Sequence, residues 1–323
     1  MATYNQILSK TQEFINKYDD FLVVAHDKPD GDTIASSIAL YLFLKKINKR
    51  VQLVCKSEVP QVFAFLKQSS EFKYDFFIGD YQAVILVDNG DLKRTGFSAR
   101  LKEIAHKKPI LNIDHHPQND IWKIAKVNLV NTKASSTAEI IYDLLRFVNP
   151  FLIKNDIATA ILTGIYTDTG GFMHPTTTSK ILALSSHLLS LGARLKTISE
   201  NLSGHRDFTT LKLWGLVLKN IRVNNELGII ASVISQDEIQ RTGATEDDLA
   251  GVVNMMNTVP GARVVLLLYE TKDGNIRGSF RTDSDKIDVS SLAEMLGGGG
   301  HKRASGFSLS GKLMKKEGKV EIV

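Results

Sequence analysis

The chain has 323 residues, of which 43% are hydrophobic and 23% are charged. This length predicts two domains, and the composition is ordinary for globular domains with real cores. The net charge of +5 is compatible with anionic substrates but too small to indicate long nucleic acid by itself. A single cysteine, Cys55, excludes an internal disulfide and favours a reducing, cytoplasmic location. No apolar stretch reaches the ~18 residues of a spanning helix, so no membrane partner is expected.

The first half of the chain alternates short apolar runs with patterns of helical spacing. The runs predict strands at residues 21–25, 51–54, 83–87 and 110–113. Helices are expected at 32–47, 136–147, 156–166 and 179–191, the second of them opened by a capping box from Ser136 to Glu139. Such alternation is typical of a parallel sheet with helices on its faces.

The pattern changes towards the C-terminus. A helix at 206–221 is interpreted as a connector, and it is followed by strands at 228–234, 262–270, 275–281 and 304–309, with helices at 245–256 and 288–296. We therefore predict an α/β protein with a parallel-sheet N-terminal domain, a helical connector and a smaller mixed-sheet α+β C-terminal domain. The expected boundaries are 1–195, 196–222 and 223–323.

Polar residues follow three of the predicted strands. The carboxyl ends of parallel strands lie along one edge of a sheet, where ligands bind. A loop after the helix at 156–166 adds one more carboxylate. Together these residues are His26, Asp30, Asp32, Asp88, Asp114, His115, His116 and Asp168.

Each of these pieces has a plainer explanation by itself. Asp-Gly-Asp in a loop is usually a turn that caps a helix, and a lone aspartate after a strand is usually a cap or a solvated end. Their joint occurrence predicts a metal site, because so many like charges would repel one another unless cations neutralised them. The absence of thiolates argues against structural zinc, and carboxylates with imidazoles suit Mn²⁺, with Mg²⁺, Co²⁺ and Fe²⁺ as alternatives.

The number of candidate ligands exceeds what one catalytic ion with open positions needs. Two divalent ions that share a bridging carboxylate fit better, and such pairs stabilise the attacking and leaving oxygens of a displacement at phosphorus. The six candidate ligands are His26, Asp30, Asp32, Asp88, His115 and Asp168.

The order of these residues resembles the motifs of a known family. His26-x3-Asp30-x-Asp32, Asp88, Asp114-His115-His116 and Asp168 resemble the four ordered motifs of the DHH phosphoesterase superfamily. The run Gly297–His301, followed by Ala304-Ser305-Gly306, is similar to the GGGH motif of the DHH-associated C-terminal domain. The two-domain layout is most similar to the NrnA-like branch of oligoribonucleases and 3′-phosphoadenosine 5′-phosphate phosphatases.

The resemblance implies a role for each metal-site residue. Asp88 would bridge both ions, and a water bridging the ions would be the nucleophile, its pKa lowered by both charges. One ion would be bound by His26 and Asp30, and the other by Asp32, His115 and Asp168.

The same resemblance implies supporting and substrate-binding roles. Asp114 would orient a neighbouring imidazole, and His116 would contact the phosphate. His174 follows Asp168 closely enough to approach the site. Across an interdomain cleft, the substrate would be bound by Arg281, Gly298, Gly299, Gly300 and His301. Plainer explanations stay open, because four glycines are most often a linker or a helix stop and an edge-strand arginine is often a surface residue.

We expect hydrolysis of di- to pentanucleotides, including linear products of cyclic dinucleotides, to nucleoside 5′-monophosphates, with 3′-phosphatase activity on bisphosphorylated nucleosides. Long duplex nucleic acid is not expected as a partner, and no aromatic-rich basic groove of the stacking type is visible. Two alternatives are an inorganic pyrophosphatase or short-chain polyphosphatase, and a non-catalytic nucleotide sensor. Family members commonly form homodimers, but the sequence leaves oligomeric state, cleavage direction and RNA or DNA preference open.

Overall fold

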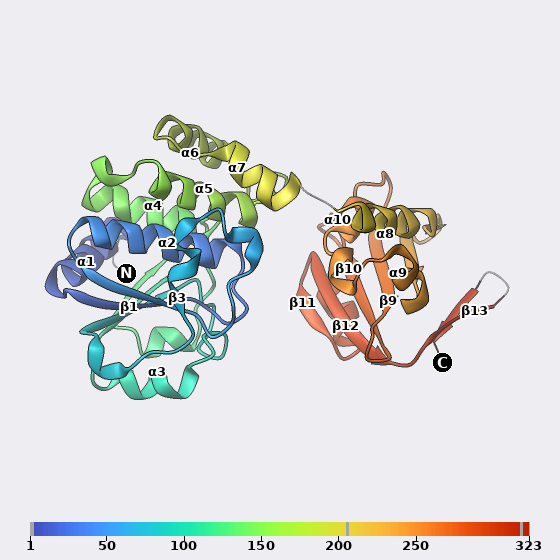
Figure 1. Cartoon of the computed structure of the whole chain (residues 1–323), viewed down its shortest axis with the longest axis horizontal. Helices are drawn as coiled ribbons and strands as arrows, with labels where there is room; N and C mark the ends of the chain where they lie inside the picture. The colour runs from blue at the N-terminus through green and yellow to red at the C-terminus, as the bar shows by residue number, and fades with distance from the viewer. Residues whose placement is uncertain (1–2, 205–206, 317–318, 323) are drawn as a thin grey trace. The chain divides into compact units, whose positions relative to one another are not determined.

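The computed structural model describes residues 3–204, 207–316 and 319–322. The chain divides into two compact units, Met1–His205 and Arg206–Val323 (Figure 1). The boundary falls inside the predicted connector, whose first part belongs to the N-terminal unit and whose second part belongs to the C-terminal unit. No helix in the described part of the chain is both long and apolar enough to cross a membrane.

The N-terminal unit is built on a sheet of six strands in the order β3-β2-β1-β4-β5-β6. All five pairings are parallel, so the predicted fold class is confirmed. The four central strands match the predicted apolar runs, whereas β3 and β6 are edge strands that the sequence analysis missed. The strands are β1 (Asp20–Val24), β2 (Arg50–Val54), β3 (Phe72–Lys73), β4 (Ala83–Val87), β5 (Ile110–Asp114) and β6 (Val127–Val130).

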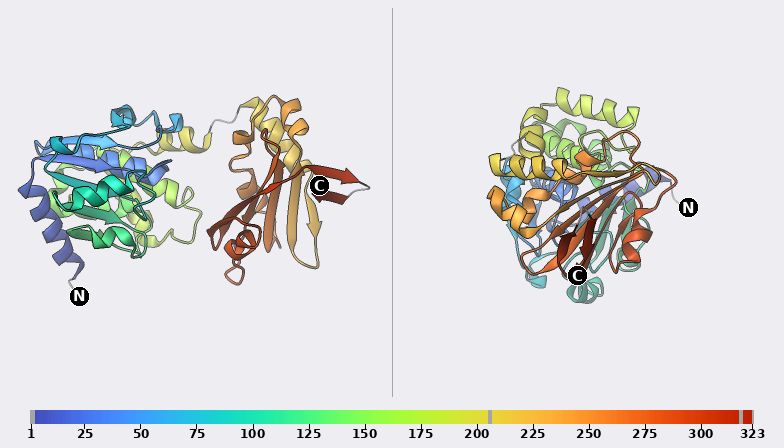
Figure 2. Two further views of the ribbon diagram at one scale, coloured as in Figure 1. Left: turned by 90° about the horizontal axis from the view of Figure 1, so that it is seen from below. Right: turned by 90° about the vertical axis from the view of Figure 1, so that its right-hand side faces the viewer.

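Helices cover both faces of this sheet (Figure 1; Figure 2). Alternate residues of β1 enter two different cores, since Phe21 and Val23 pack on one face while Leu22 and Val24 pack on the other. The larger core lies under α1 (Tyr4–Lys17), α2 (Gly31–Lys46), α4 (Thr137–Val148), α5 (Asp156–Asp168), α6 (Ser179–Ser190) and α7 (Leu195–Ser199). The smaller core lies under α3 (Ser98–Ala105).

Short helical turns connect these elements. They are η1 (Gln61–Phe63), η2 (Lys67–Glu71), η3 (Ile78–Asp80), η4 (Asp120–Lys123), η5 (Pro150–Leu152) and η6 (Glu200–Gly204).

Two helix ends differ from the prediction. Helix α5 continues through Asp168, which is therefore its last residue rather than part of a following loop. Ser136 caps α4, but Glu139 bonds the backbone of Ser135 and the ammonium of Lys180, so only half of the expected capping box forms.

The C-terminal unit has a mixed sheet in the order β11-β12-β10-β9-β8-β7. Only β8 and β9 pair in parallel, and the remaining pairs are antiparallel. The strands of this unit are β7 (Arg222–Asn224), β8 (Ile229–Ile234), β9 (Val264–Glu270), β10 (Asn275–Arg281), β11 (Gly299–His301) and β12 (Ala304–Ser310), followed by the hairpin β13 (Leu313–Lys316) and β14 (Lys319–Ile322).

The helices of this unit are α8 (Phe208–Lys219), α9 (Gln236–Thr242), α10 (Val252–Met256) and α11 (Val289–Glu294). The predicted connector helix is α8, and it packs Leu213 and Val217 into the C-terminal core; Arg206, its expected first residue, lies outside the described residues. The prediction of a single helix at 245–256 is wrong. The chain forms η7 (Glu246–Leu249) and then α10, because Gly251 between them has φ 91° and breaks the helical path.

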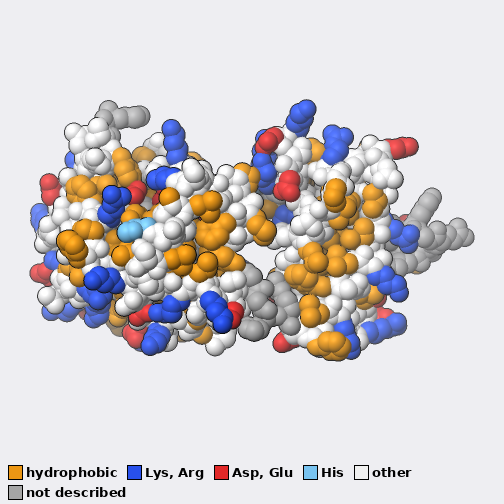
Figure 3. Space-filling view, turned by 90° about the horizontal axis from the view of Figure 1, so that it is seen from above, with side chains coloured by type: hydrophobic (Ala, Val, Ile, Leu, Met, Phe, Trp, Pro, Cys, Tyr) orange, Lys and Arg blue, Asp and Glu red, His pale blue; other side chains and the backbone are white. Residues whose placement is uncertain are grey.

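Both units expose some large hydrophobic side chains, and Figure 3 shows them among lysines and arginines on one face. Apolar side chains on a surface are common in monomeric proteins and are no sign of a partner by themselves. The features that position the site are therefore the strand ends of the N-terminal sheet and the first turns of the helices that follow them.

Candidate metal centre

The structure brings all six candidate ligands together at the carboxyl edge of the N-terminal sheet. Their ligand atoms form clusters of three residues that overlap. Within each cluster, the three ligand atoms lie within 4.8 Å of one another. The first cluster is His26, Asp30 and Asp88, and the second is Asp32, His115 and Asp168. Asp88 also forms a third cluster with His115 and His116, so it lies between the two ligand sets.

Asp88 reaches this central place through an unusual backbone conformation. It follows β4 with φ 58°, in the left-handed region that aspartate adopts more readily than most residues. Its N–H still donates to the carbonyl of Ile113, at 3.0 Å. The next residue, Asn89, is fully buried and donates its side-chain amide to the carbonyls of Val24 and Val87, each at 3.0 Å. These bonds hold the turn that directs the Asp88 carboxylate into the site.

Two helix N-termini hold Asp30 and Asp32. Asp30 is the N-cap of α2 and accepts from the Thr33 N–H at 3.0 Å. Asp32 lies in front of α4, where it accepts from the N–H groups of Thr137 at 2.6 Å and Ala138 at 3.0 Å. These are N–H groups that no helical partner would satisfy, and the helix dipole favours a negative charge at this end.

The imidazoles present ring nitrogens to the cluster. His26 Nδ1 donates to the carbonyl of Asp27 at 2.8 Å, and its Nε2 lies 3.6 Å from Asp30 Oδ2. His115 Nε2 lies 3.5 Å from Asp168 Oδ2 and 3.7 Å from Asp88 Oδ1. A histidine whose other N–H bonds a carbonyl is the usual arrangement for a metal ligand.

His116 is oriented by Asp114 rather than by the cluster. The buried Asp114 carboxylate accepts from the backbone N–H of His116 at 2.9 Å and from its Nδ1 at 2.7 Å. Burial opposes ionisation of Asp114, but the bond to His116 and its charge hold the pKa of this carboxyl below its usual value. The same bond raises the pKa of His116. Nε2 of His116 is thereby aimed away from Asp114.

Burial and neighbouring charges raise the pKa values of three aspartates of the site, whereas the bonds from His26 and Thr33 lower the pKa of Asp30 despite its burial. Burial, followed by the charges of Asp32 and Asp88, raises the pKa of Asp168 to about 10. Burial, followed by the charge of a neighbouring aspartate, raises the pKa values of Asp32 and Asp88 to about 7. Oxygen and imidazole donors without thiolates fit hard divalent cations, and cations would offset this repulsion. The donor set therefore fits a pair of such ions.

The sequence analysis missed Arg94, which lies at the edge of the cluster. Its guanidinium has Nη2 at 3.1 Å from His26 Nε2 and Nη1 at 3.4 Å from His116 Nε2. Two bonds hold the backbone of Arg94 in place. Its N–H donates to the Asp91 carboxylate at 2.8 Å, and its carbonyl accepts from the N–H of Asp27 at 2.6 Å. The only signal in the sequence is a basic residue shortly after Asp88, and nothing local distinguishes it from Lys93.

His174 lies beside the site without entering the clusters. Its Nδ1 is 3.1 Å from the backbone carbonyl of Asp168, and its ring lies against Gly170. A Cβ on Gly170 would stand 2.4 Å from His174 Nε2, so the glycine permits this contact. The structure thus shows a contact with the backbone that carries Asp168.

In the C-terminal unit, two of the expected substrate-binding residues share one row of the sheet. Ala304 on β12 pairs with Arg281 on one side and with His301 on the other. Residues paired across neighbouring strands point to the same face. Arg281 is held there by its Nε, which donates to Asn254 of α10 at 2.9 Å.

The glycine run Gly297–Gly300 was expected to be a loop. Part of it is a strand, because Gly299–His301 form β11. A Cβ on Gly298 would stand 2.1 Å from the carbonyl oxygen of Gly306, and one on Gly300 would stand 2.6 Å from Ser305 Cα. Two of the glycines are therefore required for close packing, whereas Gly299 has open space around it.

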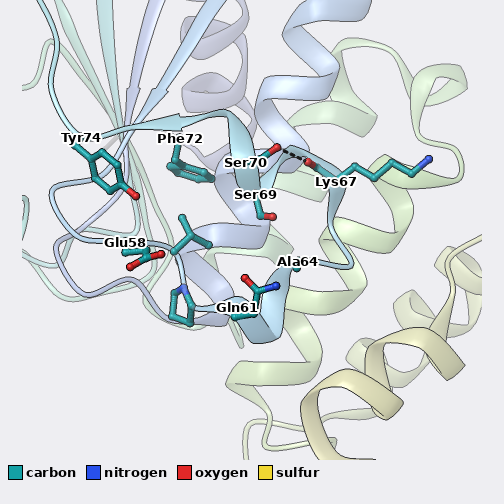
Figure 4. Close-up of a pocket in the computed structure, with 10 residues that line it drawn as sticks. Glu58, Gln61, Ala64, Lys67, Ser69, Ser70, Phe72 and Tyr74 are labelled. Carbon is teal, nitrogen blue, oxygen red and sulfur yellow. Dashed lines mark hydrogen bonds between the residues drawn. The ribbon is translucent and has the colours of Figure 1, made fainter.

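A separate cavity of about 370 Å³ opens beside η1 and β3 in the N-terminal unit (Figure 4). Its walls include the side chains of Glu58, Gln61, Phe72 and Tyr74. It contains none of the candidate ligands. The candidate centre is therefore defined by the side chains at the strand ends rather than by this cavity.

Comparison with known proteins identifies the family. The DHH family, N-terminal domain, matches residues 20–165, and the DHHA1 domain matches residues 226–321. The chain therefore contains a DHH domain followed by a DHHA1 domain. Both matches confirm the resemblance that the ordered motifs predicted, and they place this DHH protein among hydrolases that act on phosphoester bonds.

Relatives of this DHH protein extend over nearly its whole length. A Thermus thermophilus protein named "Bifunctional oligoribonuclease and PAP phosphatase NrnA" is 27% identical over 290 residues, covering 90% of this chain and 84% of the relative. A Bacillus subtilis protein of the same name is 26% identical, covering 91% of both chains. The crystal structure of an exopolyphosphatase-related protein from Bacteroides fragilis matches with a TM-score of 0.86 and 26% identity, covering 95% of this chain and 92% of that one.

Proposed function

We propose that this DHH protein is a two-metal phosphodiesterase and phosphatase. The observation that carries the proposal is the shared position of Asp88. It lies within 4.8 Å of His26 and Asp30 in one cluster, and of His115 and His116 in another. One carboxylate between two ligand sets is the arrangement that two-metal phosphoester hydrolysis needs.

The ligands divide between two ions in this proposal. His26 and Asp30 would hold one ion, while Asp32, His115 and Asp168 would hold the other. Asp88 would contribute to both sites, and Mn²⁺ is the proposed metal because carboxylates dominate the set and imidazoles complete it. When bound, the ions would make water a better nucleophile at neutral pH and neutralise charge on the phosphate.

The chain's own residues bind and orient the phosphate. Arg94 has a planar fork of N–H donors that matches phosphate oxygens, and it lies beside His26 and His116. We propose that it binds the non-bridging oxygens. His116 donates from Nε2 when protonated, and its raised pKa favours that form. Asp114 keeps the ring aligned, because it bonds Nδ1 at 2.7 Å.

Short oligonucleotides and bisphosphorylated nucleosides are the proposed substrates. The relatives from Thermus thermophilus and Bacillus subtilis carry oligoribonuclease and PAP phosphatase in their names, and each match covers at least 84% of the relative and 90% of this chain. Arg281 and His301 share a face of the C-terminal sheet, and we propose both as substrate-binding residues. Cleavage of an oligonucleotide would release nucleoside 5′-monophosphates.

Inorganic polyphosphate is a second candidate substrate. The similar structure from Bacteroides fragilis is described as exopolyphosphatase-related, and it is 26% identical to this chain. Nucleotides and polyphosphate would both bind a phosphate at the candidate metal centre. Only a nucleotide also has a base and a ribose, which Arg281 and His301 could contact.

A substrate panel separates these possibilities. Purified protein with Mn²⁺ is offered oligonucleotides of two, five and twenty residues, 3′-phosphoadenosine 5′-phosphate, pyrophosphate and short-chain polyphosphate. We expect turnover of the dinucleotide, the pentanucleotide and the bisphosphate, and slow or no turnover of the 20-residue strand. Turnover of pyrophosphate or polyphosphate alone would support the second candidate, and no turnover at all would contradict both.

A further inference from the structure

Two buried threonine hydroxyls hold the Asp88 carboxylate from opposite sides. Thr33 Oγ1 donates to Asp88 Oδ2 at 2.7 Å, and Thr137 Oγ1 donates to Asp88 Oδ1 at 2.8 Å. Both threonines are fully buried, and Asp88 is 2% exposed. Thr33 Oγ1 also lies 3.0 Å from Asp30 Oδ1, but its distance to Asp88 is shorter. We call this pair of residues the Thr33–Thr137 clamp.

The clamp fixes a torsion that is otherwise soft. The carboxylate of an aspartate turns easily about χ2, because that torsion is broad. One hydroxyl on each oxygen stops this rotation. An ionised carboxylate oxygen has about two lone-pair sites. Each oxygen of Asp88 therefore keeps one lone pair for a cation after it has accepted from a threonine.

Thr137 also connects Asp88 to the second ligand set. Its backbone N–H donates to Asp32 Oδ2 at 2.6 Å while its hydroxyl bonds Asp88. Ser136 caps α4 by accepting from Glu139 N–H, so the first N–H groups of the helix stay available for Asp32. One residue at the start of α4 thus sets the positions of two carboxylates that belong to different clusters.

Some helical threonines of the fold use their hydroxyls differently. Thr11 donates to the carbonyl of Ile7 at 2.9 Å, and Thr163 donates to that of Thr159 at 2.8 Å. Both bonds stay within one helix, which is the common arrangement for a helical threonine. The clamp threonines lie in the first turns of α2 and α4, and each reaches a carboxylate from another element instead.

We propose that Thr33 and Thr137 are positioning residues that hold the plane of Asp88 so that each oxygen faces one metal ion. This inference rests on the two-metal site of the proposed function. It adds residues that bind neither metal nor substrate. Without the clamp, Asp88 turns toward one ion and the affinity for the other falls.

The test measures metal binding by the full-length protein. Thr137→Val keeps the shape of the side chain and removes the hydroxyl, Thr137→Ser restores the hydroxyl, and Thr33→Val frees the other oxygen. Thr11→Val is the matched control, because it removes a buried hydroxyl that bonds only its own helix. Mn²⁺ stoichiometry and affinity are measured by titration calorimetry, and the electron paramagnetic resonance spectrum reports magnetic coupling between the ions.

We expect wild type, Thr137→Ser and Thr11→Val to bind two coupled Mn²⁺ ions per chain. Thr137→Val and Thr33→Val should each bind the weaker ion roughly 10–100-fold less tightly, which is the usual effect of removing a group that hydrogen-bonds a metal ligand. At partial loading, both variants should show uncoupled Mn²⁺. Circular dichroism confirms that each variant is folded.

Two coupled ions bound with wild-type affinity by either folded valine variant would overturn the inference for the threonine concerned, even if the two-metal site is correct. Absence of two ions in the wild type would instead contradict the proposed function, and the clamp with it. If Thr137→Val does not fold, Thr33→Val decides the question.

Discussion

Gly164 of α5 lies so close to Asp32 of α2 that a Cβ on the glycine would stand 2.6 Å from Asp32 Oδ1. The same Cβ would stand 2.5 Å from the Cβ of Ala138, the residue whose N–H donates to Asp32 at 3.0 Å. The absence of a side chain at Gly164 therefore lets α2, α4 and α5 meet behind one proposed metal ligand.

Gly164→Ala should destabilise the fold and displace Asp32. The added methyl overpacks a buried contact, which costs about 1–3 kcal/mol in the free energy of unfolding. Chemical denaturation measures that loss, and Mn²⁺ titration should show weaker binding of one ion. Gly215→Ala is a matched control, because Gly215 lies within α8 and its Cβ would meet nothing within 4 Å. Wild-type stability and metal binding in Gly164→Ala would contradict this role.

Asp88→Asn should stabilise the metal-free protein at pH 8 and remove its response to Mn²⁺. The pKa of Asp88 is raised from 3.8 to about 7, so the folded state holds its proton more tightly than the unfolded state. Its ionisation therefore costs stability progressively as the pH rises from about 4 to 7, and asparagine cannot ionise.

Thermal denaturation with and without Mn²⁺ measures both effects. Ligand at 100 times its dissociation constant adds about 2.7 kcal/mol, which raises the wild-type Tm by roughly 5–10 °C. Asp19→Asn is the control, because Asp19 is exposed and bonds Lys49 at the surface. A Mn²⁺ shift of wild-type size in Asp88→Asn would show that Asp88 binds no metal.

Arg94→Gln should lower kcat by roughly 100-fold, as removal of one preorganised donor to a reacting oxygen does in other enzymes. Arg94→Lys should recover part of the loss, because it restores the charge without the planar fork. Metal binding should stay near wild type, since Arg94 is not a proposed ligand. Arg50→Gln is the control, because Arg50 is exposed and bonds Asp20. An unchanged kcat in Arg94→Gln would remove this residue from the phosphate site.

Cys55 should react slowly with thiol reagents in the native protein at pH 8. Burial raises the pKa of the thiol to about 11, so little thiolate forms at that pH. The thiol also donates to the carbonyl of His26 at 3.1 Å. A colorimetric disulfide reagent should label the thiol at once in urea and slowly without it. Fast labelling of the folded protein would contradict the burial of Cys55.

The sequence was sufficient to predict the parts of the fold that depend on local pattern. The strands β1, β4 and β5 are buried along their whole length, so their sequences are mainly apolar, with Asp20, Asn112 and Asp114 as the exceptions. The edge strand β3 has only Phe72 and Lys73, which is too short for any pattern. The break at Gly251 was missed because the capping residues before it suggested a single helix.

The gathering of the candidate ligands was predictable for a topological reason. Parallel strands place their carboxyl ends at one edge, so residues that follow different strands meet there. Arg94 and Thr137 were not predictable in this way. Thr137 lies 49 residues from Asp88 in the sequence, and its hydroxyl reaches the carboxylate only because α4 begins against α2. No motif marks such a contact before the helices are placed.

Anomalous diffraction from a crystal grown with Mn²⁺ tests the central claim most directly. Data collected at the manganese absorption edge should show two peaks in each chain, about 3.5–4 Å apart. One peak should lie beside His26 and Asp30, the other beside Asp32, His115 and Asp168, with Asp88 contacting both. A single peak, or two peaks that do not share Asp88, would contradict the two-metal account.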